Sequence, residues 1–340
     1  MPLKPVILLI SLMLCAVSSA AQERPAEAPR LDTLTVQWEN DFYADTDWDY
    51  TNGIKLTWSS PVVSREEEAW TDAVENLFAI LPLLGDDGFS RALSLSVGQA
   101  AYTPANTGRA DLITTDRPYV GRLYVATGLH SRDAGRKSTW EAHLGVVGPI
   151  SFAEDTQALV HRVVGANDAK GWDHQLKNEV TLDLVHETQW RRRFYPRSTG
   201  FSLDLIPHLG GSIGTAQTYV NTGLEVRMGW RLPDDFGNCS ISAGCTSNSA
   251  FKEGRTPVPG VQLFVSANGK AVLHNIFLDG NTFRSSHSVT PEVFVGEIMG
   301  GVAWQAGPAK VTWAYIQQSR TFTTQDRNHG FGSISISWIY

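Results

Sequence analysis

Residues 33–59 read TLTVQWENDFYADTDWDYTNGIKLTWS and contain two alternating segments on either side of a polar stretch. The apolar members of these two segments are Leu34, Val36, Trp38, Ile54, Leu56 and Trp58. Alternation with a period of two indicates β-strands that have one apolar face and one polar face. The stretch between them is therefore expected to be a loop that joins two antiparallel strands.

That loop carries many carboxylate and amide side chains, namely Glu39, Asn40, Asp41, Asp45, Asp47, Asp49 and Asn52. Oxygen ligands of this kind suit Ca²⁺ better than a soft transition metal. Because Asp and Asn are also common in turns, an ordinary solvated hairpin tip is the alternative interpretation.

The C-terminal residues repeat the alternation. Ile334, Ile336, Trp338 and Tyr340 alternate with serines, and the chain stops on the aromatic residue. This pattern resembles the terminal strand of bacterial outer-membrane proteins, in which the apolar face contacts lipid and the serines face the lumen. A soluble sandwich that ends on an amphipathic strand is the alternative.

Candidate strands of this type recur along the chain, and their number is even, as a closed single-chain barrel requires. About twelve are expected, near residues 31–39, 52–60, 92–101, 119–130, 138–147, 178–190, 200–213, 218–231, 260–274, 287–305, 309–319 and 329–340. The predicted fold is therefore an all-β, transmembrane antiparallel barrel.

The N-terminal residues predict export. Lys4 precedes a short apolar run, and Ser19-Ala20-Ala21 supplies small residues for cleavage before Gln22. The apolar run is too short to span a membrane, so residues 1–21 are expected to be a signal peptide. Residues 22–340 then form one outer-membrane barrel domain.

Composition limits the partners. The formal net charge is -7 at pH 7, which does not suggest a nucleic-acid partner. Cys239 and Cys245 lie in one loop rich in Gly, Ser and Asn, and export permits a disulfide there. No His accompanies them at zinc-ligand spacing.

Strand parity places the connections. Both termini of such a barrel lie on the periplasmic side, so connections after odd-numbered strands are expected outside the cell. The expected external loops are residues 40–51, 103–118 and 149–177, and the expected tight inner turns are residues 132–135 and 306–308. Trp70, Val74, Leu77 and Leu81 recur at helical spacing, which predicts a periplasmic helix over residues 65–84.

The third external loop is expected to hold a short helix. Ser151-x-x-Glu154 is typical of a capping box, and Gly165 is a stop signal. Gln157 and His161 lie four residues apart, on one face of this helix. The alternative for His161 is a solvated surface histidine, and His174 in the same loop is a rival candidate.

Several motifs together resemble the outer-membrane lipid A 3'-O-deacylases, in the same order and over nearly the whole mature chain. The motifs are Glu39-Asn40-Asp41, Asp49-Tyr50-Thr51-Asn52-Gly53, Gly98-Gln99, Tyr102-Thr103-Pro104, Asp116-Arg117-Pro118-Tyr119, Gly145-Val146-Val147-Gly148-Pro149, Gln157-x-x-x-His161-Arg162 and Gly171-Trp172-Asp173-x-Gln175-x-x-Asn178-Glu179. The resemblance implies a twelve-stranded barrel and Ca²⁺-dependent ester hydrolysis at the outer leaflet.

The resemblance also implies roles for single residues. His161 matches the general base, Asn40 and Asp41 match the metal-site pair, and Thr51 matches a required threonine. Arg109 falls where one branch has a catalytically important Lys. The acidic residue that supports the base in that branch aligns with Asn167, so Gln157, Asp168 or water is the expected partner of the histidine.

The expected function is therefore Ca²⁺-dependent removal of the 3'-linked acyloxyacyl chain of lipid A by water that His161 activates. Arg109 or Arg117 is expected to hold a lipid A phosphate. The protein is expected to be a monomer in the outer membrane that acts on lipopolysaccharide, with its active site facing the cell exterior. An outer-membrane phospholipase-like esterase and a non-enzymatic porin or adhesin are the alternatives.

Overall fold

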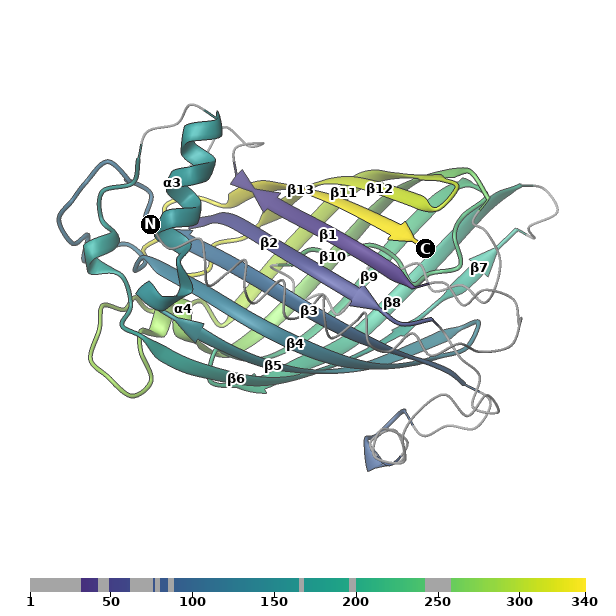
Figure 1. The fold of residues 1–340 in the computed structure, drawn as a ribbon, viewed down its shortest axis with the longest axis horizontal. Coiled ribbons are helices and arrows are strands. Elements are labelled where there is room, and N and C mark those ends of the chain that lie inside the picture. The colour runs from purple at the N-terminus through teal and green to yellow at the C-terminus, as the bar shows by residue number, and fades with distance from the viewer. Residues whose placement is uncertain are drawn as a thin grey trace. The chain divides into compact units, whose positions relative to one another are not determined.

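A computed structural model describes residues 32–41, 49–61, 76, 80–84, 89–164, 168–195, 200–241 and 258–340. Twelve long antiparallel strands form a closed barrel (Figure 1). They are β1 (Thr33–Asn40), β2 (Asp49–Ser59), β3 (Ser90–Thr103), β4 (Val120–Arg132), β5 (Arg136–Val147), β6 (Glu179–Trp190), β8 (Phe201–Gly214), β9 (Gln217–Trp230), β10 (Gly260–Asn275), β11 (Phe294–Ala306), β12 (Ala309–Gln318) and β13 (His329–Ile339). The short strand β7 (Arg192–Phe194) follows β6 and pairs with the first part of β8.

The barrel closes where β1 pairs with β13, as the C-terminal alternation predicts. Leu34 lies opposite Trp338, and Asn40 lies opposite Gly332. Along β13 the serines are buried in the lumen, whereas Ile336 is 48% exposed and Trp338 is 51% exposed. This pattern of polar inside and apolar outside is that of a barrel whose outer surface contacts lipid.

The two ends of the barrel are called here the Thr33 end and the Asn40 end, after the first and last residues of β1. The tight turns expected at residues 132–135 and 306–308 connect β4 to β5 and β11 to β12 at the Thr33 end. The three long loops expected on one side leave the Asn40 end, as strand parity predicts.

One strand prediction was wrong at its start. Residues 287–305 were expected to be extended throughout, but β11 begins at Phe294. A short helix, α4 (Ile276–Asp279), precedes this segment, and Val289 N donates to the Leu278 carbonyl while Glu292 N donates to the Thr321 carbonyl. The backbone of the segment therefore bonds to α4 and to another loop, and Pro291 lacks a donor for a strand ladder.

The predicted start of the external helix was also wrong. The helix α3 (Ala153–Val164) follows a 3₁₀ turn, η2 (Pro149–Ser151). Ser151 lies in that turn, where its hydroxyl donates to the Gly148 carbonyl at 2.6 Å. The described part of α3 ends at Val164, and Gly165 lies outside the described residues.

Other sequence predictions fall largely outside the described residues. Residues 1–31, and with them the expected signal peptide, are not described. Within the expected helix at 65–84, the described Asn76 and Ile80 are helical. Cys239 is bonded in a disulfide, whereas Cys245 lies outside the described residues.

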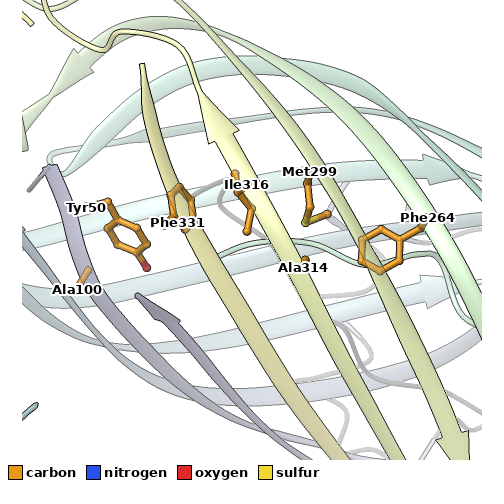
Figure 2. Packing of buried hydrophobic residues seen from close by; sticks show 7 residues of the cluster. All are labelled: Tyr50, Ala100, Phe264, Met299, Ala314, Ile316 and Phe331. Atoms are coloured by element: carbon orange, nitrogen blue, oxygen red, sulfur yellow. The ribbon is translucent and has the colours of Figure 1, made fainter. Parts of the chain in front are cut away.

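The lumen contains a buried apolar cluster that extends from the Asn40 end toward the middle of the barrel (Figure 2). It comprises Tyr50, Ala100, Phe264, Met299, Ala314, Ile316 and Phe331. Figure 2 shows that these side chains come from several strands and point into the barrel. The rings of Tyr50 and Phe331 meet edge to face, with centroids 5.1 Å apart. An aromatic cluster of this kind occupies space that an open pore would leave to water.

Residues 232–241, called here the lumen segment, enter the barrel from the Thr33 end after β9. Asp235 is 1% exposed, forms an ion pair with Arg227, and accepts a hydrogen bond from Lys310 Nζ at 2.7 Å. Further along, Ile241 N donates to Glu39 Oε1 of β1 at 2.7 Å. The segment thus bonds to strands on different sides of the lumen.

None of the described helices is long and apolar enough to cross a membrane.

Candidate functional site

The site begins where β1 ends. Asn40 is 5% exposed and Asp41 is 2% exposed, so both polar side chains are withdrawn from solvent. Asn40 Nδ2 donates to the Thr51 carbonyl at 2.8 Å, which ties the end of β1 to the start of β2. A buried polar group normally has a bonding partner, and this bond fixes the orientation of the Asn40 amide.

Thr51 lies on a bulge. The pairing between β2 and β3 shifts register between Tyr50 and Asn52, so Thr51 has no opposite residue on β3. Its buried hydroxyl is hydrogen-bonded to the hydroxyl of Thr103, with 2.7 Å between the oxygens. Bulges re-aim side chains and are frequent next to active sites, which agrees with the site role expected for Thr51.

His161 lies on α3, and only 4% of its side chain is exposed. The interpretation of this residue as a solvated surface histidine was therefore wrong. Figure 1 shows α3 at the end of the barrel where β1 finishes and β2 starts. The helix contacts β3 and β4, so the barrel wall holds His161 at the Asn40 end.

The packing of α3 depends on Gln157, one turn before His161. Trp172 Nε1 donates to Gln157 Oε1 at 2.7 Å, and both side chains are buried. Trp172, in the 3₁₀ turn η3 (Trp172–His174), also packs against the ring of Tyr119 at a centroid distance of 5.1 Å. Gln157 therefore joins α3 to the loop before β6, a role that its helical spacing alone did not predict.

A glycine permits the close approach of α3 to the barrel wall. A Cβ atom at Gly121 of β4 would lie 2.1 Å from Ser151 Oγ and 2.3 Å from Ala153 Cβ. Real Cβ contacts are never that short, so any other residue at Gly121 would push η2 and the start of α3 outward.

Arg109 is placed differently from the other predicted site residues. It lies in the exposed loop after β3, where its guanidinium pairs with the Asp111 carboxylate. This hydrogen bond raises the pKa of Arg109, so the guanidinium keeps its charge.

The partner of the His161 ring stays a prediction. Asn167 lies outside the described residues, and Asp168 is exposed. Gln157 commits its side-chain oxygen to Trp172. His174, the rival candidate, is exposed on η3.

Arg117, one of the two candidates for holding a lipid A phosphate, is buried. Its side chain is 3% exposed, forms an ion pair with Asp49, and lies over the ring of Tyr102. Its guanidinium is already engaged by Asp49 and Tyr102, so Arg109 is the more exposed of the two candidates. The motif Asp116-Arg117-Pro118-Tyr119 carries structural contacts that neither its composition nor its position revealed.

The donor chemistry at the Asn40 end fits a hard cation. Asn40 and Asp41 offer an amide oxygen and a carboxylate, the ligand types that Ca²⁺ prefers. No group of three His, Cys, Asp or Glu side chains within the described ranges is close enough to hold a metal ion. Asp45 and Asp47 of the same loop lie outside those ranges.

Comparison with known proteins identifies the family. The family described as outer membrane protein LpxR matches residues 7–340. The solved structure of LpxR from Salmonella typhimurium is similar with a TM-score of 0.72 at 16% identity, covering 91% of this chain and 100% of that one. The β domain of the Bordetella autotransporter BrkA has a TM-score of 0.43 at 10% identity, with 91% and 97% covered. No curated protein matches the chain.

Proposed function

The chain belongs to the LpxR family of outer membrane proteins, and from this membership we propose that it is a lipid A 3'-O-deacylase. The reaction is hydrolysis of the ester that links the acyloxyacyl chain to the 3-position of the sugar. The observation that supports it most strongly is the buried His161 on a helix that packs at the same barrel end as Asn40, Asp41 and Thr51.

Hydrolysis needs a base that removes a proton from the attacking water. The neutral imidazole of His161 accepts this proton while the water oxygen bonds to the ester carbonyl carbon. When the tetrahedral intermediate collapses, the same imidazole returns the proton to the departing sugar oxygen. The products are a sugar hydroxyl and a free fatty acid, so atoms and protons balance.

We assign the metal to the end of β1. The Asp41 carboxylate and the Asn40 side-chain oxygen would hold Ca²⁺, because Asn40 uses its Nδ2 group to bind the Thr51 carbonyl. When bound, the ion supplies positive charge that polarises the ester carbonyl and stabilises the developing oxyanion.

Substrate contacts are assigned to the exposed loop after β3. The side chain of Arg109 is 47% exposed, and its hydrogen bond with Asp111 raises the pKa of the guanidinium, which stays charged. A planar guanidinium binds a phosphate through paired hydrogen bonds, so Arg109 is the proposed partner of a lipid A phosphate. Such a substrate lies in the outer leaflet, so the Asn40 end is proposed to face the cell exterior. The protein is proposed to act as a monomer.

Mass spectrometry of lipids from cells with and without the protein tests this function. Lipid A is expected to lose the mass of one acyloxyacyl chain, while glycerophospholipids stay intact. Accumulation of lysophospholipids with unchanged lipid A would favour the phospholipase-like alternative. A porin would change neither lipid class, and the apolar cluster and lumen segment that occupy the barrel already argue against an open pore.

A further inference from the structure

The first residue of β2, Asp49, has an unusual backbone and a buried side chain. Its φ is 73°, in the left-handed region, and its side chain is 1% exposed. Asp tolerates this region better than most residues, but the conformation still has to be held by surrounding contacts.

Those contacts come from two other loops at the Asn40 end. The Arg117 guanidinium of the loop after β3 forms an ion pair with Asp49, and Gln325 Nε2 of the loop after β12 donates to Asp49 Oδ2 at 3.0 Å. These two loops also meet directly, because Thr324 Oγ1 donates to the Thr115 carbonyl at 2.7 Å. The Asp49 carboxylate is thus a point at which three loops converge.

Arg117 is held as firmly as Asp49. Its guanidinium carbon lies 4.4 Å from the centroid of the Tyr102 ring, and Tyr102 is stacked on Phe277 at 4.6 Å. Removal of one member of a buried ion pair leaves an uncompensated charge, so neither side chain can move independently.

This pair lies two residues from the bulge that carries Thr51. The Thr51 carbonyl accepts the Asn40 amide, and the Thr51 hydroxyl bonds to Thr103 at the end of β3. A shift of Asp49 would therefore be transmitted through the β2 backbone to Thr51 and, through one hydrogen bond, to Asn40.

We infer that the buried Asp49–Arg117 ion pair is a positioning element that sets the placement of Thr51 and Asn40, an inference that rests on the proposed function. Neither residue contacts the reacting atoms. The ion pair acts by holding the start of β2 in a conformation that its own backbone preference does not favour.

The test compares Arg117→Met, Arg117→Lys and the wild type, with Arg193→Met as a matched control. Arg193 forms two hydrogen bonds with Asp204, at 2.7 and 2.8 Å, near the Thr33 end. Arg117→Met is expected to lower kcat for lipid A about tenfold or more, because small displacements of positioned groups are costly. KM should change little, Arg117→Lys should recover part of kcat, and Arg193→Met should retain wild-type kcat.

Amide hydrogen exchange of residues 49–53 supplies a readout that does not depend on activity. Faster exchange in Arg117→Met, and not in Arg193→Met, is expected. If neither the wild type nor any variant releases fatty acid, the proposed function is wrong. Amide hydrogen exchange alone then decides whether the ion pair holds the start of β2. Wild-type exchange at residues 49–53 in Arg117→Met, or wild-type kcat in an active preparation, would overturn the inference.

Discussion

At the residue scale, the proposed chemistry depends on His161, a buried histidine on the helix α3. His161→Ala is expected to lower kcat about a hundredfold or more, the usual effect of losing a general base. His161→Asn should not restore activity, since an amide does not accept the proton. KM should change far less. Steady-state kinetics on lipid A in detergent checks this prediction. Near wild-type turnover in His161→Ala would show that His161 is not the base and would make His174 the next candidate.

The protonation of the same residue predicts a pH dependence. A base acts only when it is neutral, so kcat should fall as the pH decreases through the pKa of the base in the enzyme–substrate complex. The decline should approach tenfold per pH unit on the acidic side. The same acidic limb in the residual activity of His161→Ala would contradict the assignment of His161 as the base.

Asp41 is expected to be essential for the metal and dispensable for the fold. Asp41→Ala should abolish hydrolysis and leave the barrel folded, because the closed strand ladder stabilises the barrel. Asp155, an exposed carboxylate on α3, supplies the matched control, and Asp155→Ala should retain activity. A chelator should abolish hydrolysis by the wild type, and added Ca²⁺ should restore it. Full activity in excess chelator would show that hydrolysis does not need a metal ion.

At the element scale, α3 must pack correctly to place His161. Gln157→Leu removes the acceptor and Trp172→Phe removes the donor of one buried hydrogen bond. Each change is expected to cost about 0.5–1.5 kcal/mol of local stability and to lower kcat while the barrel stays folded. Because both changes remove the same bond, the double variant should be little worse than either single one. Additive losses in kcat would show that this bond does not hold the helix.

The strands were predictable from the sequence because alternation between lipid and lumen repeats in every one of them. The same local signal misled at residues 287–293, where Val289 and Val293 alternate with polar residues but the backbone bonds to α4 and to the loop after β12. The start of α3 was misplaced because Ser151 satisfies the Gly148 carbonyl instead of a helix amide. Sequence spacing does not show which partner a polar group will find.

At the scale of the whole molecule, the lumen segment was not predictable. Asp235 is bonded by Arg227 of β9 and Lys310 of β12, residues 8 and 75 positions away along the chain. The Asp49–Arg117 ion pair joins two loops in the same way. Contacts of this range leave no local pattern, so the sequence indicated candidate site residues on α3, β1 and β2 but not the contacts that hold these elements in place.

Because the lumen segment and the apolar cluster lie inside the barrel, we expect that the protein does not conduct ions. Trp230 of β9 pairs directly with Val261 of β10, so Arg231 and Gly260 can form a two-residue turn when residues 232–259 are deleted. The wild type should show no steady conductance in a planar bilayer. The deletion variant keeps the apolar cluster, so any rise in its conductance over the wild type measures the share of the block due to residues 232–259. Steady conductance of the wild type would contradict this prediction.

The most direct test of the central claim, that water activated at the Asn40 end attacks the acyl carbonyl, is hydrolysis of lipid A in ¹⁸O-labelled water. Mass spectrometry of the released acyloxyacyl acid should find one ¹⁸O atom in its carboxyl group with the wild type, and almost no product with His161→Ala. A released acid without ¹⁸O, or a chain transferred to another lipid, would contradict water attack and with it the role assigned to His161.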